Sequence, residues 1–175
     1  MKAKLIICHV PSGNIQQSLA FYKALFGSTD MARSLTDALQ AYHMPISNDG
    51  IDIQVVARAN PQDAPCCYYA VDDIGATVQA LVAAGGRVVV SPGPVPIAAG
   101  ALNDYRQRVN AKNPQVAVTA TLGQHALVVD PDGNPVGLIQ LEAHAHDHFK
   151  AGKPVVLDKD IADEHAVAIQ AGSKI

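Results

Sequence analysis

The sequence is short of cysteine, of clustered basic residues and of long apolar runs. Its three cysteines, Cys8, Cys66 and Cys67, are odd in number and lack the spacing of a zinc knuckle or a redox CxxC pair, so we expect reduced thiols. Thirteen Lys and Arg stand against 16 Asp and Glu, with no basic run and a net charge of −3. Such a chain has no strongly positive surface that would attract phosphate backbones or anionic lipids, so we expect neither nucleic-acid nor membrane partners.

No segment predicts a signal peptide or a membrane-spanning helix. The apolar stretch at residues 5–10 is only a few residues long and already contains His9, and Pro11 and Gly13 follow it. We therefore expect a cytoplasmic protein. The 175 residues, 49% of them hydrophobic, suffice for one ordinary domain or two small modules with a buried core.

Two segments of the same pattern are offset by 59 positions. Each begins with a strand-like run, at residues 5–10 and 66–71, followed by a residue suited to a helix N-cap, Asn14 or Asp73 (73 − 14 = 59). Apolar residues at helical spacing come next. Glycines that adopt the left-handed conformation easily are expected to end the two helices: Gly27, Gly85 and Gly86.

Runs of β-forming residues follow each helix, and they predict an α+β fold of two tandem βαβββ modules. The runs are residues 51–57, 87–91, 116–121, 124–130 and 136–141. The first module covers residues 1–58, a proline-containing linker covers 59–65, and the second module covers 66–142. Residues 29–49 must then hold the middle strands of the first module, although their pattern is poor.

Two segments lie outside the repeat. The long loop at 92–115 contains a helix-compatible stretch, residues 102–112, and is either a lid over a site or a surface loop. The C-terminal tail, residues 143–175, contains a capped helix predicted at 160–171, which we expect to dock on this domain or on a partner subunit.

A group of acidic and histidine residues stands where the last predicted strand runs into the tail. If that strand continued, these side chains would share one face: Glu142, His144, His146 and His148. Such a cluster either binds a divalent metal adventitiously or belongs to a solvated tail.

Three motifs in this order resemble the vicinal oxygen chelate superfamily of glyoxalases, bleomycin resistance proteins and extradiol dioxygenases. They are "NIQQSLAFYKALFG", "YYAVDDIGATVQALVAAGG" and "VVDPDGNPVGLIQ". The resemblance implies that each module forms half of a cup-shaped mixed sheet, with helices outside and a ligand within. It also implies that metal enzymes of the group carry their ligands on the first and last strands of each module.

The positions that the resemblance assigns to metal ligands hold Ile7, Asp52, Cys66 and Gly137. Ile7 cannot bind a metal and Gly137 has no side chain, so the ligand set is incomplete. We therefore expect no cofactor, with a divalent metal at Asp52 as the alternative.

Alternation along the strands extends the prediction to further residues, because side chains two positions apart share a face. The residues expected to face into the cup are His9, Asp52, Gln54, Cys66, Tyr68, Gly137 and Ile139. Cys8 and Cys67 are expected to face the helices as buried thiols. Cys66 has no adjacent cation in the sequence that would lower its pKa.

His9 and Asp52 are the candidates for catalysis. His9 could act as a general base or a metal ligand, oriented by Asp52, or be a structural strand histidine. Tyr68 could shape the wall of the cup or donate a proton. The chain is thus either a metal-independent isomerase or lyase or a module that sequesters a drug or metabolite, both ahead of a metal-dependent glyoxalase or dioxygenase. We expect a small-molecule ligand and a homodimer.

Overall fold

The fold is built on one mixed sheet. The computed structural model describes residues 3–26, 32–34, 41–43, 51–146 and 149, and within them eight strands form the order β2-β3-β4-β1-β5-β8-β7-β6. The strands are β1 (Lys4–Ser12), β2 (Ala32–Arg33), β3 (Ala41–His43), β4 (Asp52–Ala57), β5 (Cys66–Ala70), β6 (Arg87–Pro96), β7 (Thr121–Val129) and β8 (Pro135–Leu141). The helices are α1 (Ile15–Phe26), α2 (Ile74–Ala83), α3 (Leu102–Lys112) and the short 3-10 helix η1 (Ala143–Ala145).

The strand pairing repeats itself in the two halves of the chain. In each half the first strand runs parallel to the last, β1 beside β4 and β5 beside β8, while β1 and β5 pair antiparallel at the centre. The expected α+β fold, with a mixed sheet built from two such units, is confirmed. The β1/β5 ladder is the seam that joins the two halves.

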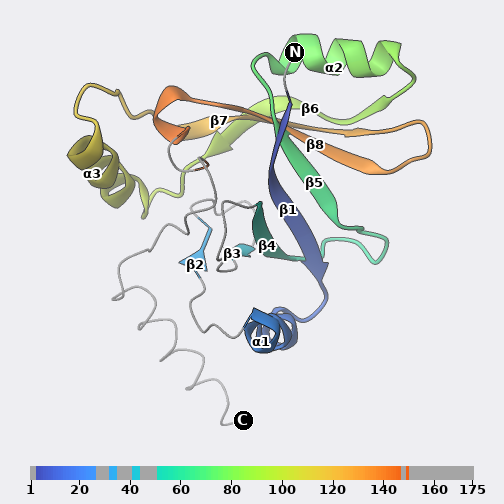
Figure 1. The fold of residues 1–175 in the computed structure, drawn as a ribbon, viewed down its shortest axis with the longest axis horizontal. Helices are drawn as coiled ribbons and strands as arrows, with labels where there is room; N and C mark the ends of the chain where they lie inside the picture. Colours follow the sequence, from blue (N-terminus) through green and yellow to red (C-terminus); the bar gives the residue numbers. More distant parts are fainter. Residues whose placement is uncertain (1–2, 27–31, 35–40, 44–50, 147–148, 150–175) are drawn as a thin grey trace.

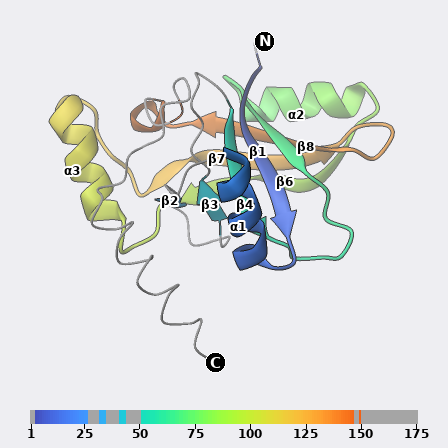
Figure 2. The same ribbon diagram turned by 60° about the horizontal axis from the view of Figure 1, so that its bottom comes forward.

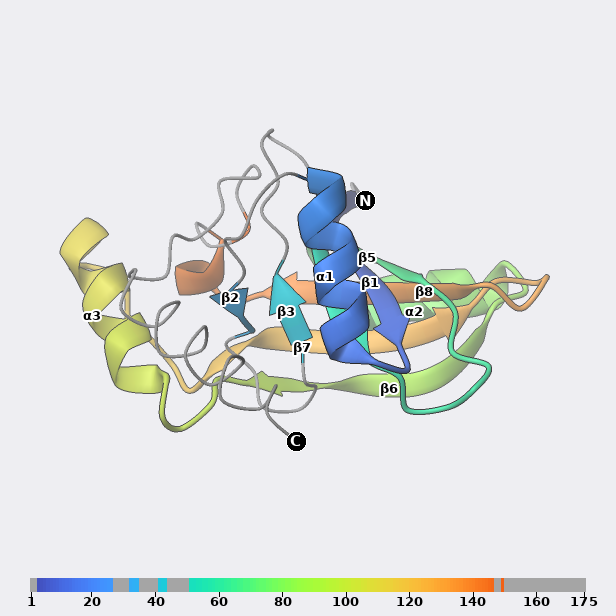
Figure 3. The same cartoon turned by 90° about the horizontal axis from the view of Figure 1, so that it is seen from below.

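Helices α1 and α2 cover the outer face of the sheet at its two ends (Figure 1). Leu19 of α1 packs with the fully buried Val55 of β4. Ile74 and Val78 of α2 pack with residues of β7 and β8: Ala126, Val128 and Leu138. The two turned views show α1 in front of β1 and α2 on the far side of β8 (Figures 2 and 3).

The helix boundaries follow the predicted capping. Asn14 Oδ1 accepts the backbone N–H of Gln17 at 3.1 Å, and Asp73 Oδ1 accepts that of Ala76 at 2.9 Å. Gly85 takes the predicted left-handed conformation, with φ of +96°. Gly86 does not: a Cβ there would lie 2.9 Å from the Leu81 carbonyl oxygen, so close backbone packing requires this glycine. Gly27 lies outside the described residues.

The strand predicted at residues 116–121 is wrong, and the strand predicted at 87–91 is longer than expected. β6 continues to Pro96 and pairs with β7 from Thr121 onward, and the residues before Thr121 form no strand beyond one backbone hydrogen bond from Ile97 to Ala120. β6 lies at the edge of the sheet. An edge strand tolerates residues without an N–H, which explains its three prolines: Pro92, Pro94 and Pro96.

The helix predicted at 102–112 is α3, which lies near the start of β7 (Figure 1). Tyr105 anchors α3 there. Tyr105 is buried in a cluster with Ile97, Leu122 and Ala145. Its hydroxyl lies 3.1 Å from His144 Nδ1, and Thr119 Oγ1 lies 3.1 Å from His144 Nε2.

The strand β8 does not continue into the tail. It ends at Leu141, and η1 turns His144 into the interior, so the predicted row of acidic and histidine side chains does not form on a strand face. His148 and the helix predicted at 160–171 lie outside the described residues. Over the ranges that the structure describes, no helix is long and apolar enough to cross a membrane.

Candidate active site

The inner face of the sheet is defined by strand alternation on β1 and β4. Ile53 packs in the α1 cluster with Leu19, which turns its neighbours Asp52 and Gln54 to the opposite, inner face. Strand β1 brings Ile7 beside Asp52 and His9 beside Gln54 in parallel register. Neighbouring side chains of both strands therefore meet on the inner face.

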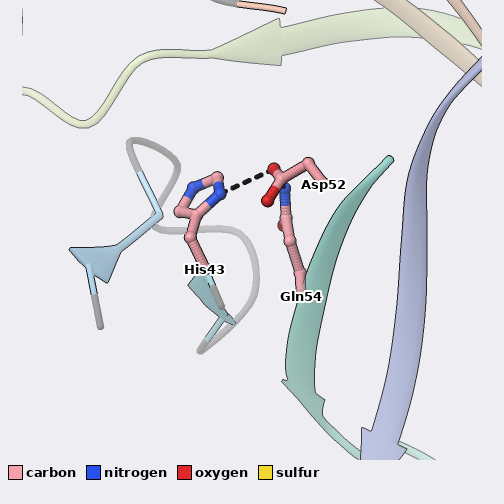
Figure 4. A network of polar contacts seen from close by, with 3 residues as sticks. All are labelled: His43, Asp52 and Gln54. Carbon is pink, nitrogen blue, oxygen red and sulfur yellow. Dashed lines mark hydrogen bonds and ion pairs between the residues drawn. The ribbon is translucent and has the colours of Figure 1, made fainter. Parts of the chain in front are cut away.

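Asp52 is hydrogen-bonded to the side chains of His43 and Gln54 (Figure 4). The His43 Nδ1 to Asp52 Oδ2 distance is 2.6 Å, and Gln54 Nε2 donates to the same oxygen at 2.7 Å. His43 comes from β3, where it is the register partner of Gln54. A carboxylate can only accept, so Asp52 fixes the proton of a neutral His43 on Nδ1 and makes Nε2 the basic nitrogen.

His9 is a neutral imidazole at pH 7. Burial lowers the pKa of His9 to about 4, against the opposing effects of the Asp52 charge and of a side-chain hydrogen bond with Gln54. The hydrogen bond with Gln54 favours the protonated form of His9, as expected when the Gln54 amide oxygen accepts from a ring N–H of His9. Since the Gln54 amide nitrogen donates to Asp52, one amide connects His9 with the His43–Asp52 pair.

Tyr68 of β5 occupies the space beside Gly137 of β8. The two residues are register partners, and a Cβ on Gly137 would overlap the Tyr68 ring. The Tyr68 ring also contacts His9, with 4.6 Å between ring centroids. Burial raises the pKa of Tyr68 to about 12, so its hydroxyl keeps its proton at neutral pH.

Cys66 is the register partner of His9 on β5 and is buried. Burial raises the pKa of the Cys66 thiol to about 11, with a smaller opposing effect from a backbone hydrogen bond of Gly137. The thiol is therefore protonated at pH 7 and is a poor nucleophile.

The second half of the sheet adds apolar surface and one further histidine. Ile139 of β8 belongs to a buried cluster with Ile6 and Ile7. His125 of β7 is the register partner of Ile139, which places both on the inner face. Burial lowers the pKa of His125, and its charge would act on His9.

The residues at the four expected metal-ligand positions do not fit a metal. Ile7 is buried and apolar, and the Tyr68 ring fills the space beside Gly137. Only Asp52 and Cys66 carry donor atoms there, and no group of three or more His, Cys, Asp or Glu in the described ranges is arranged to hold an ion.

Sequence reasoning missed two histidines of the inner face. His125 could have been found, because alternation places it opposite Ala126 and Val128, which pack toward α2. His43 could not have been found, because β3 has only three residues, too few to show an alternation of apolar and polar side chains. The other candidates, including His9, Asp52, Gln54 and Tyr68, lie on the inner face.

Comparison with known proteins shows the family. The model of the glyoxalase/bleomycin resistance protein/dioxygenase superfamily matches residues 4–138. Among curated proteins, none matches the sequence.

Solved structures show the same fold at low sequence identity. One is an uncharacterised protein from Methanosarcina mazei (14% identity, 81% of this chain and 95% of that chain covered, TM-score 0.50). A hypothetical protein from Bacillus halodurans is also similar (11% identity, 81% of this chain and 96% of that chain covered, TM-score 0.52). A third similar structure is a Streptomyces coelicolor methylmalonyl-CoA epimerase variant in complex with 2-nitronate-propionyl-CoA (11% identity, 82% of this chain and 100% of that chain covered, TM-score 0.50).

Proposed function

Because the chain belongs to the glyoxalase/bleomycin resistance protein/dioxygenase superfamily, we propose that it binds a small organic molecule on the inner face and moves a proton there as a metal-independent isomerase or lyase. The substrate class is a carbonyl compound with a hydrogen on the adjacent carbon. His43, oriented by Asp52, is the proposed base.

The observation that carries this proposal is the 2.6 Å contact between His43 Nδ1 and Asp52 Oδ2. A histidine whose Nδ1–H is held by a carboxylate presents Nε2 as a base, and the carboxylate stabilises the imidazolium that forms when a proton arrives. Gln54 holds Asp52 from a second direction at 2.7 Å, so the carboxylate is fixed before any ligand binds. The pair is thus organised for proton transfer.

The proposed reaction uses the remaining side chains for binding and orientation. His43 Nε2 takes the proton from the carbon next to the carbonyl, and the electron pair of that C–H bond moves to the carbonyl oxygen as an enolate. The Tyr68 hydroxyl, protonated at neutral pH, is the proposed hydrogen-bond donor to that oxygen. The neutral His9 accepts from a substrate hydroxyl with the nitrogen that Gln54 does not engage.

The surroundings suit a compact, largely apolar substrate. Ile7 and Ile139 lie on the same face as the polar residues, and the half-buried Val95 and Leu141 pack against them. A mostly apolar surface with a few converging polar groups is typical of small-molecule sites.

Solvent exchange tests the proposal across a panel of candidate substrates. Small aldehydes, ketones and α-hydroxycarbonyl compounds are incubated with the protein in D2O, and loss of the C–H signal is followed by proton NMR. We expect His43→Gln and Asp52→Asn to slow exchange by about 10² to 10⁴-fold, the range of general-base catalysis. His146→Gln is the matched control, because His146 is exposed and follows η1, beyond the last strand of the sheet.

Exchange that is equally fast in His43→Gln would contradict the proposed base. If compounds bind but none exchanges in the wild-type protein, the second candidate function, sequestration of a drug or metabolite, is favoured instead. The contact between the Tyr68 and His9 rings supports that candidate, since it gives the inner face an aromatic wall.

The assembly we propose is a homodimer. Phe21 and Leu25 of α1 are 64% and 62% exposed and lie four residues apart, so they share one uncovered apolar face of the helix. Sedimentation equilibrium of the wild-type chain and of a Phe21→Glu variant tests this assembly.

A further inference from the structure

Cys8 and Cys67 are paired directly across the seam of the sheet. They are register partners on the antiparallel strands β1 and β5. Opposite residues on such strands have Cα atoms about 4.5 to 5.5 Å apart, within the 4.4 to 6.8 Å that disulfides span. Both side chains point to the same face, because directly opposite residues always do.

The two thiols lie on the outer face, away from the proposed active site. Their strand neighbours His9 and Cys66 point inward, so alternation turns Cys8 and Cys67 outward, on the side of the helices. Both are half-buried, whereas Cys66 is buried. The expectation that Cys8 and Cys67 face the helix side is met, but neither is sealed from solvent.

The thiols also interact with each other. Burial raises the pKa of the Cys8 thiol, and so do the neighbouring Cys67 thiol and a hydrogen bond with it. A hydrogen bond between two thiols requires their sulfur atoms to be close.

We propose that Cys8 and Cys67 form a reversible dithiol–disulfide site that reacts with low-molecular-weight disulfides. One thiolate attacks the small disulfide, forms a mixed disulfide and releases one small thiol. The second protein thiolate then attacks the protein sulfur of that mixed disulfide, which forms the Cys8–Cys67 bond and releases the second small thiol. The protein loses two protons and two electrons, and the small disulfide gains them.

The bond would join the two halves of the sheet covalently. The β1/β5 ladder is the pairing between the half that contains β1 to β4 and the half that contains β5 to β8. A bond between residues 8 and 67 closes a long loop of chain in the unfolded state, so the oxidised protein is expected to unfold at higher temperature. Because Cys8 and Cys67 lie on the outer face, formation of the bond does not depend on the proposed proton transfer.

The vicinal pair Cys66 and Cys67 is the competing possibility. Consecutive residues of a strand point to opposite faces, so a bond between them would require β5 to leave its extended conformation. Cys66 is also the buried thiol, whereas Cys8 is half-buried, and burial raises the pKa of Cys66 to about 11. The geometry therefore favours the bond across the strands.

The test uses the folded full-length chain with glutathione disulfide at pH 8.5. Remaining thiols are blocked with N-ethylmaleimide, and the chain is analysed by intact mass and by non-reducing peptide mapping. We expect one blocked thiol per chain, at Cys66, in place of the three of the reduced protein, together with a Cys8–Cys67 linked peptide. Dithiothreitol should restore all three thiols and the lower unfolding temperature.

Serine variants provide the controls. Cys66→Ser should form the same bond, whereas Cys8→Ser and Cys67→Ser should remain as stable mixed disulfides or free thiols without an intramolecular link. A Cys66–Cys67 link, a bond between chains, or lasting glutathione adducts on wild-type Cys8 or Cys67 would each overturn the proposal.

Discussion

The aromatic ring of Tyr68 lies where a side chain at Gly137 would have to be. The two residues are paired in register on the parallel strands β5 and β8. Gly137 stands at a position that the superfamily resemblance assigns to a metal ligand, and here its missing side chain makes room for a ring that also contacts His9. The glycine is therefore part of the packing of the inner face.

This packing predicts the effect of Gly137→Ala. The added methyl group must displace the Tyr68 ring, and we expect a loss of about 1 to 3 kcal/mol in the free energy of unfolding, as for other overpacked sites. Urea denaturation measures the loss. In a Tyr68→Ala background the same substitution should cost close to nothing, because the ring is gone. An equal cost in both backgrounds would show that the ring is not the obstacle.

The lowered pKa of His9 predicts a dependence of stability on pH. The unfolded chain protonates His9 near its ordinary pKa of 6.5 and the folded chain only near 4, so between these values the unfolded state binds more protons. Stability should therefore fall as the pH decreases through this window. The contribution of His9 to this loss is about 2 kcal/mol between pH 7 and pH 5.

Chemical denaturation of wild type and His9→Gln at the two pH values separates this contribution. His125 and His144 also have lowered pKa values and contribute in the same direction, so a smaller slope remains in the variant. If His9→Gln loses as much stability as wild type between pH 7 and pH 5, His9 is not the group responsible.

Much of the fold could be predicted because its signals are local. The N-caps Asn14 and Asp73 mark the start of both helices, and the offset between them reflects the repeated unit. Alternation on the strand at 51–57 correctly separated the inward Asp52 and Gln54 from Ile53 and Val55, which pack toward α1.

The rest depended on tertiary pairing. Prolines suggested that β6 ends near Ser91, but its place at the sheet edge removes the need for their N–H groups. His43 reaches Asp52 only because β3 pairs with β4, and a three-residue strand carries no periodicity that would reveal its inward residue. The sequence therefore could not show that His43 pairs with Asp52.

The Tyr105–His144 contact predicts how α3 is held. Tyr105→Phe removes a buried hydroxyl that lies 3.1 Å from both His144 Nδ1 and the His144 carbonyl oxygen. We expect a loss of about 1 to 2 kcal/mol in the free energy of unfolding, because buried partners lose their hydrogen bond. Thermal and urea unfolding measure it. A Tyr105→Phe protein as stable as wild type would contradict this role.

The N-cap of α2 offers a prediction with a neighbouring control. Asp73→Ala removes the acceptor of the Ala76 N–H and should cost about 1 kcal/mol. The adjacent Asp72 is exposed and caps no helix, so Asp72→Ala should change the free energy of unfolding by less than about 0.5 kcal/mol. Equal effects of the two substitutions would show that the charge of this segment matters and the cap does not.

The central claim is that Asp52 holds the His43 proton on Nδ1 and so presents Nε2 as a base. Nitrogen-15 NMR of histidine-labelled protein at pH 8 measures the tautomer directly, with His43→Gln identifying the signal. We predict an Nδ1–H tautomer for His43 in wild type that is lost or mixed in Asp52→Ala. A His43 ring protonated on Nε2 in wild type, or a tautomer that Asp52→Ala leaves unchanged, would contradict the account.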